Sequence, residues 1–199
     1  MYKSTQFEAI IFDLGGVIID IDYQLTINSF EALGVNDFKN IFSKESQSHF
    51  SDEFERGEIS VNDFVEQIKN LAKIDSSNFM MKKAWNAMLL DIPKSRLDLL
   101  SQLKNTLPAF VLSNTNAEHI ARVNEYLLDE HQVDSLNPYF EKVYLSHEIG
   151  KRKPEPRAWQ QILNENNLKN PEKVLFIDDS PQHIAAAKSL GLSTHHLQV

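Results

Sequence analysis

Polar side chains that could do chemistry follow three apolar runs of this chain. Asp13 follows the first run, Ser113 and Asn114 follow the second, and Asp178 and Asp179 follow the third. A buried carboxylate is costly unless it is compensated, so Asp13 needs a metal ion, a lysine or hydrogen bonds. Two adjacent carboxylates repel each other unless a cation lies beside them. The pattern therefore indicates a polar site that holds a cation.

The elements that must position these residues alternate between strand and helix after residue 90. Because strands that alternate with helices form βαβ units, we expect an α/β fold with a mainly parallel, Rossmann-like sheet. Ligands of such a sheet bind beyond the carboxyl ends of the strands, so the polar residues should converge there. The predicted strands are 8–14, 109–113, 142–146, 173–177 and 193–197, and the predicted helices are 94–104, 117–128, 157–166 and 181–190, with Gly191 ending the last.

Residues 22–90 break this alternation and contain no convincing strand. Asp22 is predicted to cap a helix that ends near Gly34, and Ser60, with Asp63 three residues later, to cap a helix at 61–72. We expect a small inserted helical domain at 22–90, and an α/β core formed by 1–21 and 91–199. The residues expected to form its apolar faces are Phe64, Ile68 and Leu71 in one helix, and Phe79, Ala84, Trp85 and Met88 in another.

Composition limits the classes of function. The 199 residues include 42% hydrophobic and 24% charged residues, as in ordinary globular proteins, and no cysteine, which excludes disulfides and thiol catalysis. No apolar run approaches the ~18 residues that span a membrane, and the first eight residues lack a signal peptide's apolar stretch. A net charge of -8 argues against nucleic-acid binding. We therefore expect a cytoplasmic protein without a membrane partner, as a monomer or homodimer.

Asp13, Ser113-Asn114, the segment Arg152-Lys153-Pro154-Glu155 and Asp178-Asp179, in that order, resemble the haloacid dehalogenase (HAD) superfamily, most of whose members are magnesium-dependent phosphatases. The nearest likeness is to bacterial sugar-phosphate phosphatases of the glucose-1-phosphatase type. Their first motif also reads Phe-Asp-Leu-Gly and their third also reads Arg-Lys-Pro-Glu. The resemblance covers nearly the whole chain and implies a HAD core with a helical cap.

The resemblance implies a role for each motif. Asp13 would attack phosphorus and form an aspartyl-phosphate, and Lys153 would neutralise Asp13 and the transferred phosphoryl group. Ser113, through its hydroxyl, and Asn114, through its backbone N–H, would hold the phosphoryl oxygens. Each motif also has a structural interpretation, since Asp13 can cap a turn and a basic tripeptide is usually a solvated loop.

The resemblance also implies a Mg²⁺ site. The expected ligands are Asp13, Asp179 and the backbone carbonyl of Gly15, with Asp178 supporting them; which of Asp178 and Asp179 touches the metal stays open. Mg²⁺ prefers oxygen ligands in an octahedron, and these residues supply them. Gly15 is also counted among the residues around the phosphate.

Residues elsewhere in the chain are further candidates. In the cap, Arg56 and Glu58 could contact a sugar, and His49 is a weaker candidate for the same role. Glu155 could hold Lys153 or its loop. We expect His195 and His196 at the surface or at a strand end, because the seven histidines show no metal spacing.

Gly15 departs from the pattern of most HAD phosphatases, whose first motif reads Asp-x-Asp. In those enzymes the second Asp protonates the leaving oxygen and later activates water. Here Asp20, Asp22 or water would have to supply the proton. Haloacid dehalogenases also lack the second Asp, but they need no metal, and the Asp178-Asp179 pair would then be a repulsion without a purpose.

The sequence thus predicts a magnesium-dependent phosphatase that acts on a small phosphorylated metabolite, a sugar phosphate in the first instance. The alternatives are a phosphomutase, a 2-haloacid dehalogenase, and a non-catalytic protein that binds a phosphorylated metabolite. Magnesium-stimulated release of phosphate from an aryl phosphate separates these.

Overall fold

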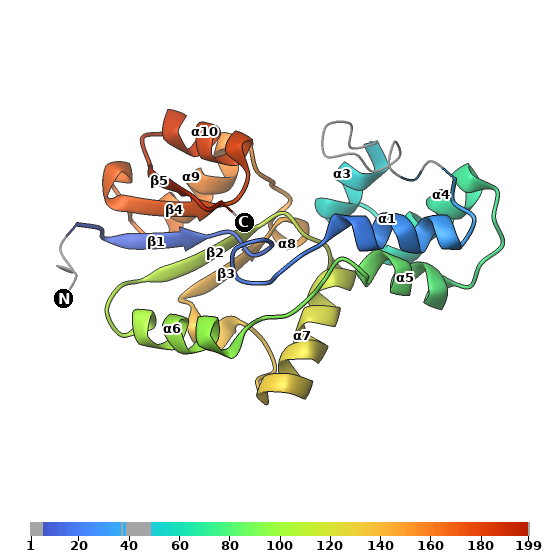
Figure 1. Cartoon of the computed structure of the whole chain (residues 1–199). Helices are drawn as coiled ribbons and strands as arrows, with labels where there is room; N and C mark the ends of the chain where they lie inside the picture. Colours follow the sequence, from blue (N-terminus) through green and yellow to red (C-terminus); the bar gives the residue numbers. More distant parts are fainter. Residues whose placement is uncertain (1–5, 37, 39–48, 199) are drawn as a thin grey trace.

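A parallel five-stranded sheet forms the centre of the molecule in the computed structural model, which describes residues 6–36, 38 and 49–198 (Figure 1). The strand order is β3-β2-β1-β4-β5, and every neighbouring pair is parallel. The predicted α/β fold is confirmed, with each strand within two residues of its expected bounds. The strands are β1 (Ala9–Phe12), β2 (Ala109–Ser113), β3 (Lys142–Leu145), β4 (Val174–Asp178) and β5 (Ser193–His196).

Helices cover both faces of the sheet (Figure 1). One apolar cluster packs α9 and α10 on one face, with Trp159 and Phe176 fully buried in it. The other packs α6 and α7 on the opposite face through residues such as Leu100 and Leu127. The bounds are α6 (Lys94–Lys104), α7 (Ala117–His131), α8 (Ser146–Ile149), α9 (Pro156–Glu165) and α10 (Pro181–Ser189), with single turns η1 (Asn137–Tyr139) and η2 (Pro171–Lys173).

A second group of helices lies to one side of the sheet, beyond the carboxyl ends of the strands (Figure 1). It has an apolar cluster of its own, in which Phe54, Phe64 and Trp85 pack together. The helices are α1 (Tyr23–Ala32), α3 (His49–Glu55), α4 (Val61–Ala72) and α5 (Asn78–Asn86). We call this group the cap.

Two chain segments that lie antiparallel connect the cap to the core. The Asp22 N–H donates to the Met88 carbonyl at 2.9 Å, and the Leu90 N–H donates to the Asp20 carbonyl at 2.9 Å. The predicted helix starts in the cap are also observed. The Asp22 carboxylate accepts from the Gln24 N–H at the start of α1, and Ser60 with Asp63 forms a capping box on α4.

Two predicted apolar positions of the cap are wrong. Leu71 is 60% exposed and Phe79 is 74% exposed. In α4 the buried stripe is shifted toward Val65, which leaves Leu71 at its edge, and in α5 Phe79 lies on the helix face opposite Met81 and Trp85. The short helices α3 and α8 were not predicted, because seven and four residues are too short for a clear periodic pattern.

Candidate active site

The polar residues that follow the strands meet at the carboxyl edge of the sheet, as predicted. Asp13 follows β1 directly, while Ser113 and Asp178 are the last residues of β2 and β4. A cavity of about 580 Å³ opens there between core and cap. Of the predicted site residues, those lining it are Asp13, Gly15, Asn114, Lys153 and Asp179.

Lys153 links the two buried acids of this edge. Its side chain is fully buried, and its ammonium group lies 2.8 Å from Asp13 Oδ1 and 2.7 Å from Asp178 Oδ2. Burial opposes the charge of this lysine, but the two carboxylates outweigh it and raise the pKa of Lys153. A fixed cation therefore lies beside Asp13 at the wall of the cavity.

Asp13 itself is 8% exposed and is held in one orientation. Its Oδ1 accepts a hydrogen bond from the Leu14 N–H at 2.6 Å, besides the ion pair with Lys153. Burial raises the pKa of Asp13 to about 7 against the opposing effect of Lys153, and the charge of Asp178 raises it further. A nearby cation such as Mg²⁺ would favour the ionised, nucleophilic form.

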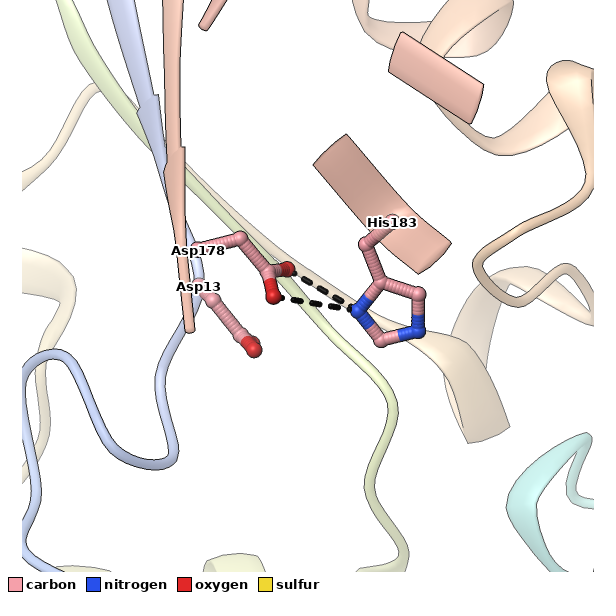
Figure 2. A group of neighbouring side chains, drawn as sticks. All are labelled: Asp13, Asp178 and His183. Atoms are coloured by element: carbon pink, nitrogen blue, oxygen red, sulfur yellow. Dashed lines mark hydrogen bonds and ion pairs between the residues drawn. The ribbon is translucent and has the colours of Figure 1, made fainter. Parts of the chain in front are cut away.

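Asp178 points into the protein rather than into the cavity. It is fully buried, and it accepts from the Ser180 N–H at 2.7 Å and pairs with His183 Nδ1 at 3.0 Å (Figure 2). Burial would raise the pKa of Asp178, but Lys153 and His183 outweigh it and lower that pKa. Both oxygens of Asp178 are therefore already engaged with protein donors.

Asp179, by contrast, lines the cavity and lies against the loop that follows Asp13. Gly16 has a φ of +73°, and a Cβ at this position would lie 2.7 Å from Asp179 Oδ2. The backbone carbonyl of Asp179 accepts a hydrogen bond from His196 Nε2 at 3.0 Å, at the end of β5. The glycine thus leaves room for the Asp179 carboxylate beside the segment that carries Asp13 and Gly15.

Two donor sets could hold a metal ion among the described residues. The ligand atoms of Asp13, Asp178 and His183 lie within 4.8 Å of one another (Figure 2). Because Mg²⁺ prefers oxygen ligands and Asp178 is occupied by Lys153, the set of Asp13, Asp179 and the Gly15 carbonyl fits Mg²⁺ better. The donors present are therefore compatible with the predicted ion.

Asn114 has a function that the sequence did not reveal. Its side-chain amide donates to the Lys153 carbonyl at 2.8 Å and accepts from the Lys153 N–H at 2.8 Å. This pair of hydrogen bonds fixes the backbone of the loop that carries Lys153. Ser113 is 3% exposed at the end of β2 and is not among the residues lining the cavity.

The predicted substrate contacts in the cap are not supported by the geometry. Arg56 forms an ion pair with Glu155 and does not line the cavity, and Glu58 is exposed outside it. Glu155 therefore holds the cap rather than Lys153 directly. His49 belongs to α3, but its side chain lies outside the described part of the structure. His195 and His196 are exposed at the end of β5, as predicted.

The cap contributes other residues, which sequence reasoning missed. Tyr23, Asp52 and Glu55 line the cavity together with Arg152 of the core. The only sequence signal for the acids was the spacing of Phe50 and Phe54, which favours a helix with both acids beside its apolar stripe. Burial raises the pKa of Glu55, against the opposing charge of Arg152.

Neither proposed substitute for the missing acid faces the cavity. Asp22 caps α1, and Asp20 forms an ion pair with Arg96 at 2.7 Å. At Gly15 itself φ lies outside the left-handed region, and a Cβ would lie 3.2 Å from Ile21 Cδ1. The backbone therefore requires glycine at position 16 but not at position 15.

Comparison with known proteins identifies the class. The family model of haloacid dehalogenase-like hydrolases matches residues 7–191, so the chain belongs to this family, and the predicted resemblance is confirmed. Among the described residues, no helix combines the length and apolar character needed to cross a membrane.

Particular relatives are similar over nearly their whole length. D-ribitol-5-phosphate phosphatase of Bacteroides thetaiotaomicron is 30% identical over 93% of this chain and 89% of its own. Sesquiterpene phosphatase astK of Aspergillus oryzae is 24% identical over 97% of this chain and 91% of its own. Among solved structures, the chain is similar to bt-2542, a HAD family enzyme of Bacteroides thetaiotaomicron that was solved as a variant in complex with magnesium and inorganic phosphate. The TM-score is 0.89, and the identity is 31% over 96% of this chain and 94% of that one.

Proposed function

We propose that this hydrolase is a magnesium-dependent phosphatase that acts on a small phosphorylated metabolite, a sugar or sugar-alcohol phosphate. The observation that carries the proposal is the pairing of Asp13 with fully buried Lys153 at the wall of the cavity. Two relatives named as phosphatases, and a solved neighbour that holds magnesium and phosphate, support it.

In the proposed reaction a carboxylate oxygen of Asp13 attacks phosphorus, and the bond from phosphorus to the ester oxygen breaks. Lys153 holds Asp13 in place and offsets the charge that spreads over the phosphoryl oxygens. Water then hydrolyses the aspartyl-phosphate and regenerates Asp13. The Asn114 N–H is proposed to hold a phosphoryl oxygen, while the Asn114 side chain keeps Lys153 in register. Ser113 stays a prediction for the same role, although it is buried and does not line the cavity.

We propose Asp13, Asp179 and the Gly15 carbonyl as the protein ligands of Mg²⁺. When bound, the ion would neutralise phosphoryl charge and align the phosphorus with Asp13. Asp178 is proposed to support the site indirectly, because it pairs with Lys153 and His183 and does not face the cavity. We also propose that the cap comprises residues 22–90 and the core residues 1–21 and 91–199. The two antiparallel segments that connect cap and core lie at these boundaries.

Because position 15 is a glycine, we propose that water protonates the leaving oxygen. General acid help is worth about 10²–10⁴-fold, so poor leaving groups should react slowly in the chemical step. The state as monomer or homodimer and the cytoplasmic location stay predictions of the sequence.

The test is phosphate release from a panel of phosphorylated metabolites, with and without Mg²⁺. We expect turnover that a chelator abolishes and Mg²⁺ restores, and at least a hundredfold loss in Asp13→Asn, equivalent to about 3 kcal/mol or more. Calcium should replace magnesium poorly, because its coordination is larger and looser. Chloride release from a 2-chloro acid in the presence of chelator would overturn the proposal in favour of a dehalogenase.

A further inference from the structure

Charged residues line the end of the cavity that the cap closes. The cap contributes Asp52 and Glu55, three residues apart on α3, and the core contributes Arg152, the residue before Lys153. This end faces whatever part of a substrate lies beyond the phosphoryl group at Asp13. Its chemistry therefore decides which leaving groups the cavity accepts.

Arg152 is paired with both acids. Its Nη1 lies 2.6 Å from Asp52 Oδ1, and its Nη2 lies 2.8 Å from Glu55 Oε2. The two acids differ in exposure to solvent: the Glu55 side chain is 12% exposed, whereas the Asp52 side chain is 39% exposed. Glu55 therefore fixes the guanidinium, while Asp52 presents its carboxylate to the cavity as well as to Arg152.

The charges of this group do not suit a second anion. Two carboxylates and one guanidinium sum to one negative charge, and both carboxylates lie on Arg152. A carboxylate has about four lone-pair sites, so Asp52 can accept hydrogen bonds from hydroxyl groups in addition to the one from Arg152. A carboxylate or second phosphate on a substrate would instead meet like charge in a partly desolvated site.

We propose that Asp52, held by Arg152 and Glu55, is a specificity-determining residue that accepts hydrogen bonds from the hydroxyl groups of a neutral, polyhydroxylated leaving group. The same residue disfavours phosphorylated metabolites that carry a second anionic group. This inference rests on the proposed phosphatase function and adds to it the residue that selects the leaving group.

The experiment compares kcat/KM for a pentitol phosphate, for 3-phosphoglycerate and for 4-nitrophenyl phosphate in the wild type and in Asp52→Asn. We expect the wild type to prefer the pentitol phosphate to 3-phosphoglycerate by at least tenfold. Asp52→Asn should lower the ratio of pentitol phosphate to each of the other two substrates by about tenfold, because a neutral acceptor replaces a charged one. An unchanged ratio, or a wild type that hydrolyses both metabolites equally, overturns the inference.

Glu66→Gln is the matched control, since Glu66 is another acid of the cap, paired with Lys69 at 2.8 Å and outside the cavity. It should leave the substrate ratios as in the wild type, and the inference fails if it shifts them as much as Asp52→Asn does. Calorimetry in an Asp13→Asn background, with Mg²⁺ present, gives a readout without turnover. There Asp52→Asn should weaken pentitol phosphate about tenfold more than inorganic phosphate.

The two proposals can fail separately. Absence of phosphate release from every substrate by the wild type would refute the phosphatase function. Equal weakening of pentitol phosphate and inorganic phosphate in calorimetry would refute the role of Asp52, whether or not the protein turns over. If the ion pair between Asp52 and Arg152 is purely structural, Asp52→Asn will lower the stability of the protein without changing either substrate ratio.

Discussion

Gly16→Ala tests the proposed metal site through a residue that is not itself a ligand. The added Cβ would lie 2.7 Å from Asp179 Oδ2 and 2.9 Å from its Cγ, well inside contact distance, so the Asp179 carboxylate must move. The φ of +73° adds a backbone cost of about 1–2 kcal/mol for any residue with a Cβ. Gly16→Ala should therefore both strain the backbone at position 16 and displace the Asp179 carboxylate.

The two effects have different sizes and different readouts. The backbone strain should lower the unfolding temperature by about 2–8 °C in a chain of this length. Displacement of a metal ligand should weaken Mg²⁺ binding by about 10–100-fold, as losses of ligand support usually do. Mg²⁺ affinity is measured by calorimetry on the protein without substrate, and the Mg²⁺ requirement of phosphate release is measured beside it.

Gly191→Ala is the matched control for the strain. Its φ is +84°, and its Cβ would come no closer than 3.8 Å to Pro171 Cβ. It should therefore show the loss of stability with Mg²⁺ affinity unchanged. If Gly16→Ala binds Mg²⁺ as tightly as Gly191→Ala does, Asp179 is not the ligand that we propose.

Three further predictions concern two buried titratable groups and the missing acid. Lys153→Met leaves Asp13 and Asp178 without their shared cation and should destabilise the protein by about 3–5 kcal/mol in urea unfolding with chelator present; a loss below about 1 kcal/mol would contradict the pairing. His119, buried and stacked on Trp85, has its pKa lowered by burial from 6.5 to about 4, so its contribution to stability is complete above pH 6.5 and is lost as the pH falls toward 4. At about 1.4 kcal/mol per pH unit, the stability of the wild type relative to His119→Gln should fall by about 3 kcal/mol over that range, and a constant difference would be inconsistent with a neutral buried imidazole. Gly15→Asp should reduce the dependence of single-turnover phosphate transfer on leaving-group pKa, and a wild type without such dependence would show that another acid is in place.

The sequence was sufficient for the strands and for their convergence because both depend on local patterns. Continuous apolar runs define β1, β2 and β4, and the rule for parallel sheets places the residues after them at one edge. Lys153 was selected by resemblance, and its burial between two acids could not be read from a basic tripeptide. Its position depends on Asn114, 39 residues away in the chain.

The sequence could not assign the two adjacent acids or the cap end of the cavity. Asp178 is the last residue of β4 and is fully buried, whereas Asp179 follows the strand and lines the cavity, and the sequence of two adjacent acids does not show which is which. The contact of Asp52 with Arg152 joins residues 100 positions apart, one in a helix of the cap and the other in a loop of the core. Such contacts depend on how the cap packs on the core, for example on Gly57, where a Cβ would lie 2.2 Å from the His147 carbonyl oxygen.

The two glycines that follow Asp13, Gly15 and Gly16, differ in how strictly the structure requires a glycine. Gly16 is required by its φ and by Asp179, whereas at Gly15 the nearest obstacle to a side chain is the end of Ile21. A flexible methyl group can give way by a few tenths of an ångström, so the backbone does not explain why an acid is absent there. The atoms that lie within 4 Å of a Cβ at position 15 belong to Ile21, so an added carboxyl group has room beside the cavity that Gly15 lines. Gly15→Asp should therefore install a competent proton donor, and the rate with alkoxide leaving groups should rise more than the rate with aryl leaving groups. If both rates rise or fall together, the acid is not what this site lacks.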